Sequence, residues 1–207
     1  MGPAWLSVDF RLFFMHRHFL LHKPYGYLSQ FTSDFARELR KKRFLGELYD
    51  FPAGTMAIGR LDEHSEGLLL LTTDGQVSAQ IRSQAVEKEY YVQLDGLITE
   101  AAVAQLAQGV EIGIRSERYH TLPCAVRQLP VPPSLLPRAR RIRDDRHGPT
   151  SWISISLSEG KFRQIRKMTA AVGFPTLRLV RVRVGSIWLG DLGAGEVREV
   201  PVLLQRE

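Results

Sequence analysis

The chain has 207 residues, of which 44% are hydrophobic, so it suits one large domain or two closely packed halves and is not a low-complexity segment. Its formal net charge of +6 favours a polyanionic partner, with nucleic acid as the first expectation and a membrane surface as the second. The single cysteine, Cys124, excludes an internal disulfide and fits a reducing cytosol, and no apolar run approaches membrane-spanning length.

Residues 1–18 form a basic, acid-poor extension ahead of the first expected strand. Two explanations stay open: the segment is poorly ordered, or Met15 is the true start. His16, His18 and His22 are close in sequence but have no cysteine or carboxylate partner nearby, so a metal site is not expected.

Residues 19–27 predict a strand that ends at Pro24 and turns at Gly26. Residues 35–43 have helical spacing and end in four consecutive cations, which are Arg40, Lys41, Lys42 and Arg43. Such a run is typical of a solvated face, although in a basic protein it can equally contact phosphates.

The central stretch is a polar loop held against a buried strand. Gly59 and Gly67 bracket the loop and permit tight turns or a close backbone approach. The four leucines at 68–71 predict a strand buried on both faces, and Asp74 is placed to cap a helix that begins near Gln76. Asp62 in this loop is the candidate reactive carboxylate, although the pattern alone more often marks a local ion pair or cap.

The middle of the chain alternates helices and strands. A helix is expected at 76–83, a strand rich in β-formers at 86–94, and a helix at 99–108 capped by Thr99. Further strands are expected at 110–114 and 122–129. The segment 129–150 is rich in proline and arginine, which predicts a loop that either contacts phosphates or is a surface insertion without a role, and we favour the RNA contact.

Residues 151–157 alternate polar and apolar side chains, which predicts a half-buried strand. Residues 159–168 are interpreted as a helix that buries Ile165 and presents a second, basic face made of Arg163, Arg166 and Lys167. Two closing strands are expected at 176–184 and around 196–204.

Three patterns carry a family resemblance. They are Gly-Arg-Leu-Asp-x-x-Ser-Glu-Gly-Leu-Leu-Leu-Leu from residue 59, Lys-x-Tyr at Lys88 and Tyr90, and Glu-Gly-x-x-Arg-Gln-x-Arg-x-Met from residue 159. In this order they resemble the signatures of the pseudouridine synthases that modify ribosomal RNA, over about residues 19–201. One departure is His22, which stands where the family usually has asparagine.

The resemblance implies roles for single residues. Asp62 matches the aspartate that these enzymes require, Tyr90 (rather than Tyr91) matches the tyrosine that stacks on the target base, and Arg166 matches the arginine that pairs with the aspartate. Other implied substrate-binding residues are Arg60, Lys88, Arg163 and Ile165, and candidate RNA contacts are Lys167, Arg138, Arg140, Arg141 and Arg143.

The resemblance also implies the architecture: an α/β fold of the mixed α+β kind, with one mostly antiparallel sheet flanked by helices and a central cleft. Residues 19–207 would be the catalytic domain, without a separate N-terminal RNA-binding domain, as in the compact subgroup similar to large-subunit synthase E. The expected activity is site-specific conversion of uridine to pseudouridine in ribosomal RNA, most simply of the large subunit, by a cytoplasmic monomer.

The chemistry explains these residue types. The isomerisation moves the ribose bond from N1 to C5 of uracil without redox change or an imported group, so neither a cofactor nor a metal is expected. A carboxylate can act as nucleophile or as base, a paired arginine favours its ionised form, and an aromatic ring can hold a flipped base. One rival interpretation is a non-catalytic RNA-binding or ribosome-assembly protein. The other is a different carboxylate-based enzyme, a glycosidase or phosphatase, of which the glycosidase would need a second carboxylate such as Glu63 or Glu66.

Overall fold

The computed structural model describes residues 16–83, 86–138, 142 and 145–203, so the expected extension lies almost wholly outside it. The helices are α1 (Ala36–Lys41), α2 (Gly75–Ser83), α3 (Glu100–Gln108) and α4 (Gln164–Ala171). The strands are β1 (His18–Lys23), β2 (Met56–Ile58), β3 (Glu66–Thr72), β4 (Lys88–Asp95), β5 (Glu111–Ile114), β6 (Glu117–His120), β7 (Ala125–Leu129), β8 (Thr150–Leu157), β9 (Thr176–Val184), β10 (Ile187–Trp188) and β11 (Val197–Val200).

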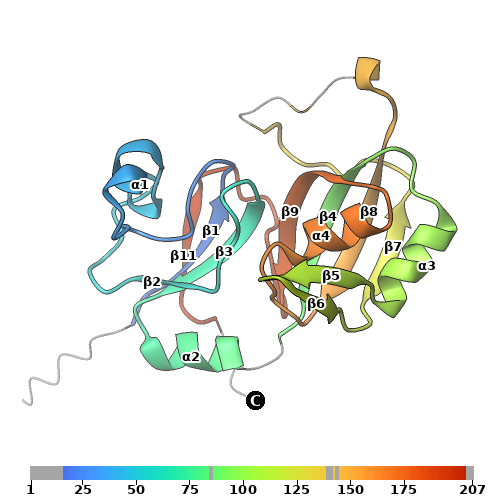
Figure 1. The fold of residues 1–207 in the computed structure, drawn as a ribbon. Helices are drawn as coiled ribbons and strands as arrows, with labels where there is room; N and C mark the ends of the chain where they lie inside the picture. The colour runs from blue at the N-terminus through green and yellow to red at the C-terminus, as the bar shows by residue number, and fades with distance from the viewer. Residues whose placement is uncertain (1–15, 84–85, 139–141, 143–144, 204–207) are drawn as a thin grey trace, which may run out of the picture.

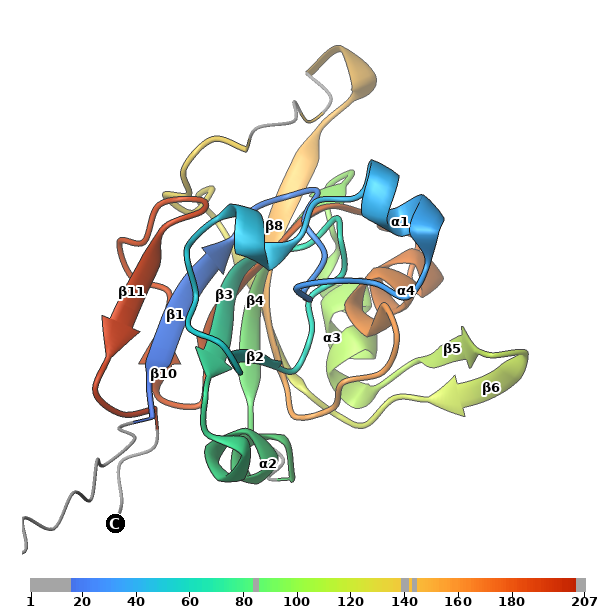
Figure 2. The same ribbon diagram turned by 90° about the vertical axis from the view of Figure 1, so that its left-hand side faces the viewer.

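One sheet runs through the molecule in the order β11-β1-β3-β9-β4-β8-β7, with β2 paired to β3 and β10 to β9 (Figures 1 and 2). Within this sheet β3 and β9 are parallel, and the other strand pairs are antiparallel. The mixed, mostly antiparallel α+β fold predicted from the sequence is confirmed. In the described part of the chain, no helix is long and apolar enough to cross a membrane.

The sheet has two halves that meet between β3 and β9. One half carries α1 and α2, and the other carries α3 and α4 (Figure 1). A buried cluster crosses the junction, since Leu68 and Leu70 of β3 pack with Val180 and Val182 of β9. The halves therefore share a core, and loops that end at the junction are held by both.

Strand β3 is buried at every residue, as the leucine run predicted. It pairs with β9 at Glu66 and Gly67, and Gly67 faces Arg181 with φ +107°. A Cβ at this position would clash with the backbone carbonyl and amide of Arg181. Only glycine fits this junction.

The substitution Gly67→Ala is expected to lower the free energy of unfolding by about 3 kcal/mol or more, because positive-φ strain and a backbone clash add. The measurement is urea unfolding followed by circular dichroism. Gly75→Ala is the matched control: a Cβ there would have no atom within 4 Å, and the residue begins α2, so the change should be neutral or mildly stabilising. Equal stability of the two variants would contradict this account of the junction.

Two predicted helix caps are confirmed. The Asp74 carboxylate accepts hydrogen bonds from the backbone N–H groups of Gln76 and Val77 at the start of α2. The Thr99 hydroxyl accepts one from the N–H of Ala102 in α3. These bonds satisfy donors that the first helical turn leaves unpaired.

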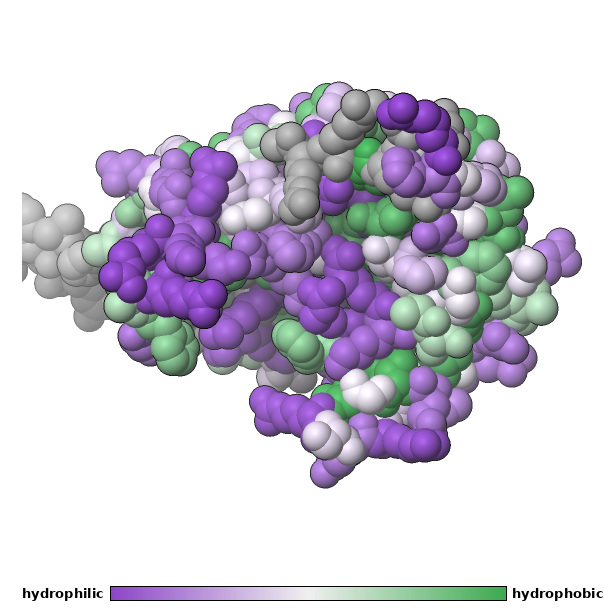
Figure 3. Space-filling model, turned by 45° about the horizontal axis from the view of Figure 1, so that its top comes forward, coloured by the Kyte–Doolittle hydropathy of each residue, from purple (hydrophilic) through white to green (hydrophobic). Residues whose placement is uncertain are grey.

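Helix α1 has no buried residue, so its basic end is exposed. Figure 3 shows mainly hydrophilic side chains on the face that carries this helix. The exposure is compatible with both interpretations of the basic run, a solvated face and a phosphate contact.

Several strands differ from those expected. Strand β8 is not half-buried: Ser151 and Ser154 are buried, and their hydroxyls donate to the Gly96 carbonyl and the Glu89 carboxylate, which lets small polar residues lie inside. Strand β6, the hairpin partner of β5, was not anticipated, because its mostly exposed side chains give no hydrophobic pattern. The closing strand β11 is shorter than 196–204.

Candidate active site

The loop that carries Asp62 connects β2 to β3 and is fixed on both sides. Gly59 turns the chain with φ +73°, and the N–H of Ser65 donates to the carbonyl of Asp62 at 3.0 Å. The backbone of buried Leu61 forms two hydrogen bonds with the hydroxyl of Ser29, of 2.9 and 2.8 Å. Asp62 itself keeps 24% of its side chain exposed, so the carboxylate faces solvent from a rigid support.

Lys23 anchors the same loop through hydrogen bonds to backbone carbonyls. Its side chain is completely buried, and its ammonium donates to the carbonyls of Pro24 at 2.9 Å, Tyr27 at 2.7 Å and Glu63 at 3.4 Å. The N–H of Gly26 also donates to the Glu63 carbonyl, at 2.8 Å. The turn after β1 and the Asp62 loop are thereby joined.

Burial lowers the pKa of Lys23 from 10.5 to about 7. Between about pH 7 and 10.5, Lys23 therefore carries a proton in the unfolded chain but not in the folded chain. Because the unfolded chain binds more protons, the contribution of Lys23 makes the free energy of unfolding rise with pH in that window. Lys23→Met should show a smaller gain in unfolding free energy between pH 7 and pH 9 than the wild type, as measured by urea unfolding at both values. An identical gain in both proteins would contradict the assignment.

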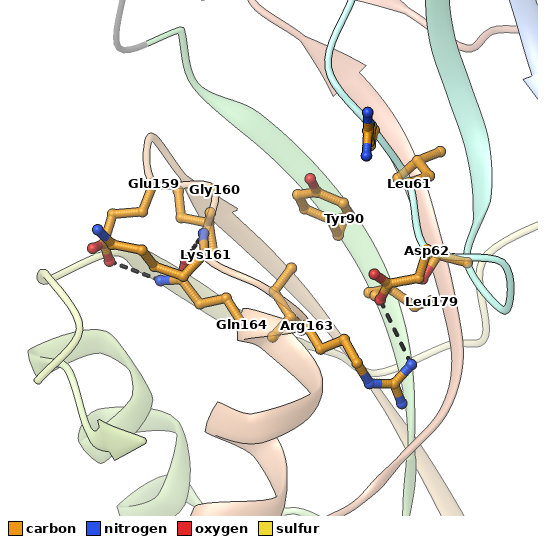
Figure 4. Close-up of a pocket in the computed structure, with 13 residues that line it drawn as sticks. Leu61, Asp62, Tyr90, Glu159, Gly160, Lys161, Arg163, Gln164 and Leu179 are labelled. Atoms are coloured by element: carbon orange, nitrogen blue, oxygen red, sulfur yellow. Dashed lines mark hydrogen bonds and ion pairs between the residues drawn. The ribbon is translucent and has the colours of Figure 1, made fainter. Parts of the chain in front are cut away.

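Two arginines flank the Asp62 carboxylate. Arg163 Nη1 and Arg166 Nε each lie 3.9 Å from Asp62 Oδ2, and Figure 4 shows Arg163 pointing toward that carboxylate. Arg166 also donates from Nη2 to the carbonyl of His64 at 2.7 Å and to the hydroxyl of Ser65 at 3.3 Å. Burial, with the neighbouring Arg163 cation, lowers the pKa of Arg166, but arginine stays charged.

The helix expected from residue 159 begins only at Gln164. Arg163 has φ +52°, a left-handed conformation that interrupts helical geometry just before α4. Arg163 is thus a loop residue, and it shares no helical face with Lys167, whose ammonium donates to the Gly113 carbonyl of β5. The loop is anchored instead by Glu159, which accepts hydrogen bonds from Tyr119, the N–H of Leu122 and the side chain of Gln164.

A small hollow of about 90 Å³ opens beside the carboxylate. Its wall includes Asp62, Tyr90 and Arg163, which are labelled in Figure 4. Arg60 and Ile165 also line it, so the structure brings together five of the residues expected at the site. Tyr91, the less favoured tyrosine, packs against a hydrophobic cluster on another side of β4.

Lys88 lies in an adjoining hollow with Arg60, Tyr90 and Arg181, and its ammonium donates to the Ser158 carbonyl at 3.2 Å. Burial and the nearby Arg181 cation lower the pKa of Lys88. The lysine is therefore a neighbour of the Asp62 hollow and does not line it.

The basic segment 129–150 reaches the site through Arg138. Its guanidinium lies 4.5 Å from the ring centroid of Tyr25, and that ring stacks on His64 at 5.1 Å. The other candidate contacts in this segment, Arg140, Arg141 and Arg143, lie outside the described residues.

The carboxylates that a glycosidase would need are engaged elsewhere. Glu63 accepts a hydrogen bond from Lys42 at 2.6 Å, and Glu66 is buried in an ion pair with Arg178 at 3.0 Å. Within the described residues, no three His, Cys, Asp or Glu side chains gather in a way that could hold a metal.

Comparison with known proteins identifies the family. Residues 17–171 match the family model described as RNA pseudouridylate synthase. The chain belongs to this family. Ribosomal large subunit pseudouridine synthase E of Xanthomonas campestris pv. campestris is 41% identical over 86% of this chain and 92% of its own length. The protein of the same name from Xanthomonas axonopodis pv. citri is 42% identical over 80% of this chain and 84% of its own length.

A solved structure, the crystal structure of a pseudouridylate synthase, superposes on this pseudouridine synthase with a TM-score of 0.68. The two sequences are 29% identical, and the match covers 89% of this chain and 70% of the solved chain. The family resemblance inferred from the three sequence patterns is confirmed, including its likeness to large-subunit synthase E.

Sequence reasoning missed two features of this synthase's site. It assigned nothing to Lys23, although this lysine directly follows His22, the position noted as a departure from the family. It also gave no part to Glu159, which anchors the loop before α4, or to Phe162, a residue of that loop that lines a second hollow beside Asp62. Their position inside the third pattern was the available signal.

Proposed function

We propose that this pseudouridine synthase isomerises a specific uridine of large-subunit ribosomal RNA, with Asp62 as the catalytic carboxylate. The observation that carries the proposal is the Asp62 carboxylate, partly exposed beside a hollow and flanked at 3.9 Å by Arg163 and Arg166. Family membership and the names of the relatives at 41–42% identity support the reaction and the RNA class.

The reaction breaks the bond between ribose C1′ and uracil N1 and forms one between C1′ and C5. The C5 proton is lost and N1 gains a proton, so atoms and electrons balance within the nucleotide. The Asp62 carboxylate acts as nucleophile or as base in the glycosidic step, and the two arginine cations orient it.

The other hollow-lining residues are assigned by their surroundings. Tyr90 and Ile165 offer an aromatic ring and an apolar side chain beside Asp62, which suit a uracil that has left its stack. Arg60 lines this hollow and the one that contains Lys88, so both cations suit phosphate contacts along the same strand.

The test uses purified protein and large-subunit rRNA that carries tritium at uracil C5. Isomerisation must release that tritium to water, whereas binding or glycosidic hydrolysis need not. A small-subunit rRNA transcript prepared in the same way is the matched control. Release from the small-subunit RNA alone would overturn the substrate assignment, and no release from either RNA, free or in ribosomal particles, would favour a non-catalytic RNA-binding protein.

We also propose that the enzyme is a cytoplasmic monomer in which residues 19–207 form one catalytic domain. The sheet that continues through both halves supports a single unit. Light scattering after size-exclusion chromatography, with and without RNA, tests the monomer; a constant dimer mass in both samples would contradict it.

A further inference from the structure

A second, larger hollow adjoins the Asp62 carboxylate. Its volume is about 590 Å³, within the range of roughly 300–1,000 Å³ that is typical of ligand sites. Residues 28–30 line one side, and the loop before α4, from Gly160 to Arg163, lines the other. Arg60, Leu61 and Asp62 belong to the walls of both this hollow and the smaller one.

The two hollows differ in their aromatic residue. Tyr90 lines the smaller hollow, and Phe162 lines the larger one. Phe162 is 68% exposed, so it contributes little to a core and its ring is accessible for stacking on a base. The ammonium of Lys167 lies 5.2 Å from the centroid of this ring.

The larger hollow is lined by charges of both signs. Its wall includes the cations Arg60, Lys161 and Arg163 and the carboxylates Glu38, Asp62 and Glu63. Lys42 pairs with Glu63 at 2.6 Å and Arg163 lies 3.9 Å from Asp62, so cations balance the two carboxylates of the Asp62 loop. An aromatic ring among cations, next to a reacting carboxylate, is the combination that binds a base and its phosphate.

We propose that the larger hollow is a subsite for the nucleotide next to the target uridine in the same RNA strand, with Phe162 stacking on its base. The inference rests on the proposed function, because it needs a uridine in the smaller hollow. Since the hollows share Asp62 and Arg60, they adjoin, and an RNA strand whose uridine enters the smaller hollow can continue through the larger one. Arg60 and Lys161 lie where they can contact the linking phosphates.

The test uses a hairpin oligoribonucleotide that contains the uridine mapped by the tritium assay. Phe162→Ala should raise KM by roughly 5- to 150-fold, the cost of losing one base stack, with kcat little changed. Phe162→Trp should retain the wild-type KM. Trp188→Ala is the matched control, because Trp188 is 53% exposed and has the Arg183 cation 5.4 Å from its ring, yet it lies on β10 and lines neither hollow.

A second hairpin series replaces the 5′ or 3′ neighbour of the uridine by an abasic residue. One of the two abasic hairpins should have a higher KM with the wild type than the unmodified hairpin has. On that abasic hairpin, Phe162→Ala and the wild type should have the same KM. The subsite would be overturned if Phe162→Ala left KM unchanged, or if it raised KM by the same factor on every hairpin, abasic or not. In either case wild-type turnover would still support the proposed function. Absence of wild-type turnover on rRNA and hairpins would overturn both.

Discussion

Asp62→Asn is expected to reduce pseudouridine formation by at least about 10³-fold, because an amide can neither attack as a nucleophile nor accept a proton. The change preserves the size of the side chain, and its backbone is fixed by Ser65 and by the Ser29 bonds to Leu61. RNA affinity should stay the same or rise slightly, since one negative charge is removed from a basic surface. Tritium release and a filter-binding assay on the same RNA measure the two effects.

The matched control for this variant is Asp191→Asn, which alters an 83% exposed aspartate paired with Arg198. It should retain wild-type turnover. If Asp62→Asn kept more than a few per cent of the wild-type rate while remaining folded by circular dichroism, the catalytic assignment would be lost.

Local signals in the sequence predicted the elements that depend on neighbouring residues. The four leucines indicated β3, Asp74 and Thr99 indicated two helix starts, and proline after Lys23 indicated the end of β1. These elements depend on residues only a few positions apart, so hydrophobic spacing and capping side chains are enough to predict them. The predicted start of α4 was wrong because the left-handed backbone at Arg163 leaves no trace in hydrophobic spacing.

The site depends on contacts that a pattern cannot contain. The Lys23 ammonium reaches a carbonyl 40 residues away, and the Arg166 guanidinium reaches one 102 residues away. Spacing alone left Asp62 as a plausible local ion pair; only the family resemblance selected it. The family resemblance implied a central cleft, but spacing could not locate the larger hollow, because its lining comes from segments far apart in the sequence.

Arg166→Lys is expected to lower kcat by about 10²- to 10³-fold with little change in KM. The Arg166 guanidinium holds the Asp62 loop from two atoms: Nη2 donates to the His64 carbonyl, and Nε lies 3.9 Å from the carboxylate. That Nε is buried and has no hydrogen-bond partner within the described residues. A catalytic bond that is long without substrate commonly tightens when substrate binds, and a lysine, with one nitrogen, cannot keep both contacts.

Arg163→Lys is the comparison that separates orientation from charge. Both arginines lie 3.9 Å from the same oxygen, but Arg163 is 39% exposed against 12% for Arg166. A lysine at 163 preserves the charge in a solvated setting, so its kcat should fall by about 10-fold or less. Single-turnover rates at saturating RNA measure both variants. If lysine at 163 slowed the chemical step as much as lysine at 166, the buried two-point hold would not set Arg166 apart from Arg163. If neither lysine variant slowed the chemical step, positive charge would be the only requirement and the hold by Arg166 would have no part in catalysis.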